Sequence, residues 1–251
     1  MNLFGETPMK IVVFNSSPKL SKSNTQVMVD AFLAGAQQAG ADTESVMLAK
    51  YKIRPCTGCL TCWVKTPGKC AIKDDAAALH EKYLGTDVAV FATPLYVDNV
   101  SGIMKNFMDR LLPIVDPHFE MKPDGETGHR GAAGPRPDLG FISNCGFPEQ
   151  SHFQVLRLLA ARMARNSNVR LAFEIYRGGG GILGAQNAML EPIVNAYKEL
   201  VSQAGREFAQ SGAISDTTQQ KLEQPLLPPQ IYIDNANRMW DKLLARHEKA
   251  E

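Results

Sequence analysis

The stretch KIVVFNSSPKLSKSNTQ, residues 10–26, joins a short apolar run to a loop of small hydroxyl and amide side chains. An almost continuously apolar run is typical of a strand buried on both faces of a parallel sheet. The loop opens a predicted helix near 24–39, and backbone N–H groups at a helix N-terminus attract anions. Because the loop has neither a GxxxxGK[ST] motif nor the glycines of a dinucleotide turn, it predicts a phosphate-binding turn of another type.

The rest of the chain repeats this alternation of β-rich runs and longer helical segments. The predicted strands are 10–15, 43–48, 87–93, 139–144 and 169–176. The predicted helices lie near 24–39, 74–84, 100–114, 151–166 and 186–211. Five strands joined by helical crossovers predict a doubly wound parallel α/β sheet.

Two further loops follow predicted strands, so we expect them at the same sheet edge as the first loop. In TPLYVDN (93–99), Pro94 stiffens the turn and Tyr96 offers an aromatic surface. In SNCGFPEQ (143–150), Gly146 permits close approach of the backbone to a ligand. In a sheet of order 2-1-3-4-5, the first two of these three loops flank the topological switch point, where flavodoxin binds FMN. The three loops together therefore predict a seat for a flat ring with a phosphate tail.

Three stretches carry a resemblance to a known family: NSSPKLSKSNT, TPLYVDNVSGIMKNFMDR, and a cysteine loop followed by KDD. They resemble the NAD(P)H-dependent FMN reductase and iron–sulfur flavoprotein group of the flavodoxin-like superfamily, over about residues 9–176. The resemblance implies a flavodoxin-like fold, bound FMN, NAD(P)H as co-substrate, and a homodimer or homotetramer. It implies FMN phosphate contacts at Ser17, Ser23, Asn24 and Thr25, ring contacts at Pro94, Leu95, Tyr96 and Val97, and closure of the pyrimidine side by Asn144, Cys145 and Gly146.

The cysteine loop contains Cys56, Cys59, Cys62 and Cys70, in the spacing Cys-x2-Cys-x2-Cys-x7-Cys. A compact run of this kind can wrap an iron–sulfur cluster, and the resemblance implies a [4Fe–4S] cluster close enough to FMN to exchange electrons. Bare thiols, zinc and a disulfide are the alternatives, and the spacing leaves all of them open. We interpret the fifth cysteine, Cys145, as a small apolar residue near the flavin.

Composition excludes several classes of partner. The chain has 27 basic and 26 acidic side chains, so no broad charge favours nucleic acid or an anionic membrane. No apolar run approaches the roughly 20 residues of a membrane span, and the first residues lack the pattern of a signal peptide. We therefore expect a cytoplasmic protein whose partners are a small-molecule electron donor and acceptor.

The expected domain organisation is a flavodoxin-like FMN-binding domain over residues 1–211 and a C-terminal extension over 212–251. A Gly- and Pro-rich insertion interrupts the domain at about 116–137. The extension is expected to pack on its own domain or on a partner subunit, and its last part predicts an amphipathic helix. In GGGGILG (178–184), Gly179, Gly181 and Gly184 match GxGxxG, but Glu199, 20 residues on from Gly179, falls inside a predicted helix. We interpret this segment as a flexible loop over the active-site edge.

The predicted function is that of an FMN-dependent NAD(P)H oxidoreductase that passes electrons through flavin to free flavin, a quinone, a nitro compound or an iron centre. The alternative is an iron–sulfur flavoprotein that carries electrons between partners through FMN and a cluster. A third possibility is a binding module of the same fold without its cofactor. Because a flavin carries the chemistry itself, the sequence predicts no obligatory catalytic side chain.

Overall fold

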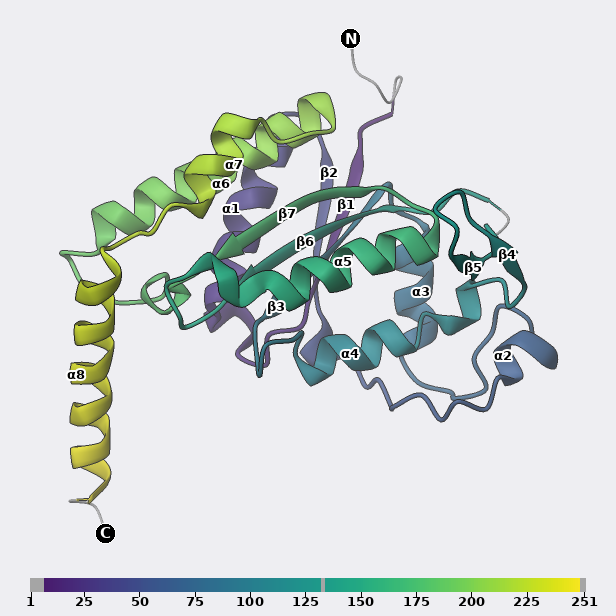
Figure 1. Ribbon diagram of the computed structural model, residues 1–251, viewed down its shortest axis with the longest axis horizontal. Helices are drawn as coiled ribbons and strands as arrows, with labels where there is room; N and C mark the ends of the chain where they lie inside the picture. Colours follow the sequence, from purple (N-terminus) through teal and green to yellow (C-terminus); the bar gives the residue numbers. More distant parts are fainter. Residues whose placement is uncertain (1–6, 132–133, 249–251) are drawn as a thin grey trace.

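The computed structural model describes residues 7–131 and 134–248. Its centre is a parallel sheet with helices on both faces (Figure 1). The five strands are β1 (Lys10–Asn15), β2 (Asp42–Met47), β3 (Val88–Pro94), β6 (Asp138–Asn144) and β7 (Leu171–Arg177). They lie in the order β2-β1-β3-β6-β7, with every neighbouring pair parallel. The predicted five-stranded parallel α/β sheet is confirmed, because each predicted strand coincides with an observed one.

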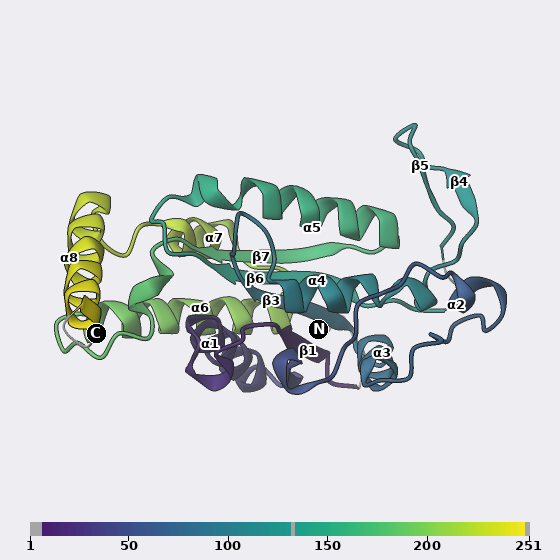
Figure 2. The same ribbon diagram turned by 90° about the horizontal axis from the view of Figure 1, so that it is seen from below.

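Helices form a layer on each face of the sheet (Figure 2). The helices are α1 (Asn24–Gln38), α2 (Thr61–Val64), α3 (Ala76–Leu84), α4 (Gly102–Asp109), α5 (Gln154–Ser167), α6 (Glu191–Ser211), α7 (Asp216–Glu223) and α8 (Pro229–Glu248). Short 3₁₀ turns lie at Leu20–Lys22, Leu48–Lys50, Leu112–Ile114, Gln150–Phe153 and Gly180–Ile182. Buried residues of α1 and α6 share one core with the sheet, and those of α3, α4 and α5 share the other.

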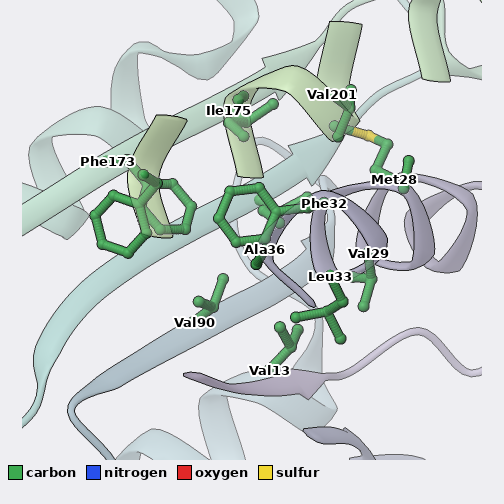
Figure 3. Packing of buried hydrophobic residues seen from close by; sticks show 14 of the residues in the cluster. Val13, Met28, Val29, Phe32, Leu33, Ala36, Val90, Phe173, Ile175 and Val201 are labelled. Carbon is green, nitrogen blue, oxygen red and sulfur yellow. The ribbon is translucent and has the colours of Figure 1, made fainter. Parts of the chain in front are cut away.

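The core on the α1 side explains why the sequences of β1 and β3 are almost continuously apolar. Figure 3 shows Phe32 of α1 pointing toward Phe173 of β7, and the two ring centroids lie 4.7 Å apart. Val13 and Val90 of the central strands lie beneath them and are fully buried. Alternate residues of the same strands face the other core, so β3 is buried along its whole length. Burial on both faces is why apolar residues run almost continuously through β1 and β3.

Helix α4 is shorter than the helix predicted near 100–114. It begins after Ser101, whose hydroxyl accepts a hydrogen bond from the Met104 amide, and it ends at Asp109. A 3₁₀ turn over Leu112–Ile114 follows and includes Pro113. Proline lacks an amide proton and disfavours helical geometry in the residue before it, which is why the helix does not continue.

The insertion at 116–137 is not wholly irregular. It forms an antiparallel hairpin of β4 (Phe119–Met121) and β5 (Thr127–His129), which projects from one end of the molecule (Figure 2). Asp124 and Gly125 lie at its turn, and Gly125 has a φ of 79°, a conformation that glycine adopts without strain.

The C-terminal extension divides into two parts. Helix α7 packs on the domain: Leu222 is fully buried, and the Gln219 side chain donates to the Glu174 carbonyl over 3.1 Å. Helix α8 projects away from the sheet (Figure 1). Its apolar residues Met239, Trp240, Leu243 and Leu244 are exposed. The helix expected in the last part of the extension is confirmed. The domain boundary at residue 212 and the packing of this helix on a partner subunit stay predictions.

Residues 1–6 of the predicted domain, 132–133 of the insertion and 249–251 of the extension lie outside the described residues. None of the helices in the described ranges is long and apolar enough to cross a lipid bilayer.

Candidate functional site

The loops that follow β1, β3 and β6 meet at the carboxyl edge of the sheet and are tied together by hydrogen bonds. The Ser16 amide donates to the Ala92 carbonyl over 2.9 Å, and the Ser101 hydroxyl donates to the Ser16 hydroxyl over 2.9 Å. The Leu95 amide donates to the Asn144 carbonyl over 2.9 Å and links the second loop to the third. The three predicted loops therefore form one continuous edge that includes the switch point between β1 and β3.

Polar contacts fix the loop after β1. The Ser17 amide donates to Asn15 Oδ1 over 2.9 Å. Ser23 caps α1, because its hydroxyl accepts from the amide three residues on over 3.0 Å. The Thr25 hydroxyl accepts from Asn144 Nδ2 over 2.8 Å, so the first turn of α1 is bonded to the third loop. Of the four predicted phosphate contacts, Ser17, Ser23 and Thr25 are buried and Asn24 is half-buried. Ser23 and Thr25 act as acceptors in these bonds, which leaves their O–H groups able to donate to an anion.

The loop after β3 contains a strained turn. Tyr96 and Asn99 form a bridge through two backbone hydrogen bonds, and Val97 and Asp98 between them have φ values of 48° and 55°. Two consecutive left-handed residues are the mark of a type I′ turn, which favours Asn and Gly. Val97 is 97% exposed and Tyr96 is 46% exposed, whereas Pro94 is buried. The tip of this turn therefore presents an uncovered apolar and aromatic surface at the carboxyl edge.

We expect Val97→Gly to raise the free energy of unfolding by about 1 kcal/mol. A β-branched residue in the left-handed region costs about 1–2 kcal/mol, and glycine removes this cost while its greater freedom in the unfolded chain returns part of it. Urea unfolding of the two proteins measures the difference. Asp98→Gly in the same turn is the control and should gain less, because aspartate tolerates this conformation better than valine. A lower unfolding midpoint for Val97→Gly would show that the valine side chain stabilises the turn.

The loop after β6 combines a packed thiol with an open backbone. Cys145 is buried, its S–H donates to the Phe147 carbonyl over 3.2 Å, and burial raises the pKa of the thiol. A side chain built at Gly146 would meet no atom within 4 Å, so the backbone there borders open space. Asn144 is buried and accepts and donates across the other two loops. This agrees with the interpretation of Cys145 as a packing residue.

The four clustered cysteines line one shallow hollow, together with Asp109 and Arg110. Cys56, Cys59, Cys62 and Cys70 are all free thiols. Hydrogen bonds from Thr61 lower the pKa of the exposed Cys59 thiol to about 7, whereas burial, followed by the charge of Cys70, raises that of Cys62. Across residues 7–131 and 134–248, no three or more His, Cys, Asp or Glu side chains are arranged as a metal site. The four thiols that could bind an iron–sulfur cluster thus line one hollow, but they do not have the arrangement of a formed metal site.

A buried ion pair holds the cysteine loop in place. The Arg110 and Asp74 side chains are each 1% exposed, and the guanidinium donates to both carboxylate oxygens over 2.7 and 2.9 Å. The same guanidinium donates to the carbonyls of Arg54 and Ile72, which precede and follow the four cysteines. Burial opposes ionisation of Asp74, but the hydrogen bonds from Arg110 and from two amides outweigh it and lower the pKa to about 2.

The cysteine hollow and the three loops lie at opposite ends of α4. Ser101 at the start of the helix bonds to the first loop, and Arg110 after its end lines the hollow. Figures 1 and 2 both show α2, which carries Cys62, at the end of the molecule away from the carboxyl edge. Eight helical residues span about 12 Å. Within one chain, the structure therefore does not bring the cysteines beside the proposed ring contacts.

Comparison with known proteins identifies the family. Residues 9–133 match the family of NADPH-dependent FMN reductases. The chain belongs to this family. A relative named iron–sulfur flavoprotein, from Archaeoglobus fulgidus, is 38% identical over 105 residues, which cover 42% of this chain and 46% of the relative. This FMN reductase family member spans about half the length of the curated relatives it matches.

Solved structures share the fold of this FMN reductase family member. An FMN-dependent NADH-azoreductase from Bacillus anthracis, solved in complex with FMN, aligns with a TM-score of 0.59 at 14% identity, covering 80% of this chain and 99% of that one. An NAD(P)H:quinone oxidoreductase from Methanothermobacter marburgensis aligns with a TM-score of 0.57 at 15% identity, covering 80% and 98%. At these identities the likeness shows the fold alone.

Sequence reasoning missed two features near these sites. The Arg110–Asp74 pair was signalled only by the KDD that follows the cysteines. The second is Arg177, at the end of β7, which is fully buried. The sequence shows only an arginine at the end of a strand-like run. The same pattern is expected where a strand ends at the protein surface. The glycine segment 178–184 was interpreted as a flexible loop, but Gly178–Gly180 are buried and a 3₁₀ turn begins at Gly180.

Proposed function

We propose that this chain binds FMN at the carboxyl edge formed by the loops after β1, β3 and β6, and that it passes electrons from NAD(P)H to a second acceptor. The observation that carries the proposal is the hydrogen-bonded union of these three loops at the switch point of the sheet. Free flavin, a quinone, a nitro compound or an iron centre are the acceptor classes we propose. When bound, FMN supplies the two-electron redox chemistry that connects donor and acceptor.

The residues of the first loop fit a phosphate. Ser17, Ser23 and Thr25 bring hydroxyl groups to the N-terminus of α1, and Asn24 adds a half-buried carboxamide there. Amides at a helix N-terminus and short hydroxyl donors are the chemistry that phosphate groups need. In this proposal these groups hold the phosphate and fix where the rest of the cofactor lies.

The second and third loops fit the ring. Tyr96 and Val97 offer exposed apolar surface, Leu95 is half-buried beside them, and the open backbone at Gly146 can approach a ring edge. Asn144 would support the pyrimidine side through the bonds that join it to the other loops. The protein's part is to bind and orient the donor and acceptor on the uncovered side of the ring.

We expect Asn24→Asp to weaken FMN binding about 100-fold and to leave riboflavin binding unchanged. A carboxylate at the start of α1 repels a phosphate but favours the helix, so the fold should lose no stability. Fluorescence titration with FMN and with riboflavin, which lacks the phosphate, measures both affinities.

Asn166→Asp, the same change at an exposed position near the end of α5, is the control and should bind FMN as the unaltered protein does. An unaltered protein that takes up no FMN, either oxidised or reduced, would overturn the proposed function. If Asn24→Asp lost affinity for FMN and for riboflavin equally, this loop would not be the one that binds the phosphate.

A second candidate function is that of an electron carrier with a [4Fe–4S] cluster at Cys56, Cys59, Cys62 and Cys70. The hollow lined by all four thiols favours it. Iron and sulfide analysis of anaerobically purified protein tests it, with Cys145→Ser as a control that should leave the iron content unchanged. Less than one iron per chain would overturn the cluster at these four thiols.

A further inference from the structure

Arg177, the last residue of β7, places a guanidinium in the interior of the protein. Its side chain is fully buried, and within residues 7–131 and 134–248 none of its three guanidinium nitrogens has a hydrogen-bond partner. The guanidinium lies 4.8 Å from the ring centroid of Tyr197 in α6. A cation–π contact recovers only part of the cost of burying a charge, so the isolated protein keeps this arginine at a loss of stability.

A carboxylate whose charge acts on Arg177 is already paired with another group. Glu223 accepts from Arg157 over 2.9 Å. Tyr176 belongs to the core on the α5 side, whereas Ile175 belongs to the core on the α1 side. Side chains alternate along a strand, so Arg177 points to the side of the sheet that α1 and α6 cover.

This side of the sheet carries the proposed phosphate site. In the pairing of β6 with β7, Arg177 lies opposite Asn144, and adjacent strands are about 4.8 Å apart. The Asn144 side chain donates to Thr25 in the first turn of α1 over 2.8 Å. One strand spacing and one hydrogen bond therefore connect the buried cation to the residues proposed to hold phosphate.

The glycines after Arg177 close over the same place. A Cβ atom at Gly180 would lie 2.8 Å from the Asn144 side chain, and one at Gly184 would lie 2.7 Å from Asn24 Oδ1. A side chain at Gly180 would collide with Asn144, so glycine permits this close approach, and Arg177 beside it is shielded from solvent. Exclusion of water strengthens the effect of a charge on its surroundings.

We propose that Arg177 is the buried counter-charge of a phosphomonoester held at the first turn of α1, and that it acts through the intervening Asn144–Thr25 bond rather than by contact. The ligand class is a mononucleotide phosphate, here the phosphate of FMN, so this inference rests on the proposed function. Arg177 is in this sense a positioning residue: it selects for the phosphorylated flavin over the same flavin without phosphate.

The test compares FMN with riboflavin in the full-length protein. We expect Arg177→Met to weaken FMN binding about tenfold to hundredfold and to leave riboflavin binding within twofold. The ligand-free variant should be at least as stable as the unaltered protein, because an unpaired buried charge is replaced by an apolar side chain of similar length. Arg177→Lys keeps the charge and should keep the preference for FMN within about threefold.

The outcomes separate the two ideas. If the unaltered protein binds no FMN, the proposed function fails, and this inference fails with it. If it binds FMN but Arg177→Met loses FMN and riboflavin equally, or loses neither, the inference alone is overturned. If Arg177→Met does not fold, loss of the FMN preference in a folded Arg177→Lys protein overturns it and retention supports it.

Discussion

Asn in place of Asp74 is expected to lower the free energy of unfolding by about 3–5 kcal/mol. The substitution leaves the Arg110 guanidinium buried without its opposing charge, and an unpaired charge in the interior is among the most costly single changes. Because Arg110 also bonds to carbonyls on both sides of the cysteine loop, the loop should become sensitive to proteolysis. Urea unfolding and limited trypsin digestion measure the two effects.

The control for this prediction is Asp109→Asn at the rim of the same hollow. Asp109 pairs with Lys105, but both side chains are largely exposed, so its loss should change stability by less than about 1 kcal/mol. Similar results for Asp74→Asn and Asp109→Asn would show that the buried pair contributes nothing beyond a surface ion pair.

The same pair predicts how stability depends on pH. The pKa of Asp74 is lowered to about 2 in the folded protein from an ordinary value of 3.8. The stabilisation from this group is therefore complete above about pH 5 and is lost progressively as the pH falls through about 4 to 2. The difference in unfolding free energy between the unaltered protein and Asp74→Asn should shrink over this range.

A methyl group at Gly205 is expected to lower the free energy of unfolding by about 3 kcal/mol. Helices α1 and α6 approach so closely that a Cβ at Gly205 would lie 2.0 Å from the Phe32 carbonyl oxygen, and one at Gly35 would lie 1.8 Å from the Ser202 carbonyl oxygen. Both obstacles are backbone atoms, so no side-chain rotation relieves the clash and the helices must separate. Chemical unfolding of Gly205→Ala measures the cost, and Gly35→Ala should behave alike.

Gly102→Ala provides the matched control. Gly102 is the first residue of α4, its added Cβ would meet no atom within 4 Å, and its φ is not positive. Alanine should leave stability unchanged or raise it by about 0.5–1 kcal/mol through the reduced freedom of the unfolded chain. A cost below about 1 kcal/mol for Gly205→Ala would mean that α1 and α6 separate with little loss of packing.

The elements that could be predicted are those whose local pattern and environment agree. The central strands β1 and β3 are mostly apolar because both of their faces are covered, and Ser23 and Ser101 mark helix starts by the caps they form. The hairpin in the insertion had a usable signal, Asp124-Gly125, which is typical of a tight turn. Helix α7 was missed because Leu222 is its single apolar residue, and one residue makes no periodic pattern.

The candidate site was predictable to the same extent. Parallel strands bring their carboxyl ends to one edge, so three loops could be placed together from the strand pattern alone. Cysteine spacing tells which residues can share a ligand, but it carries no information on where the loop packs against α4. The burial of Arg177 likewise depends on α6, which lies beyond it in sequence and covers it through Tyr197.

The separation of the thiols from the carboxyl edge makes the chain suited to labelling. Cys59 is exposed and its pKa of about 7 leaves much of it as thiolate at neutral pH, whereas Cys145 is buried at the other end of the molecule. A maleimide dye attached at Cys59 would stand clear of the proposed FMN site. It would thus report ligand uptake by energy transfer to the bound chromophore without displacing it.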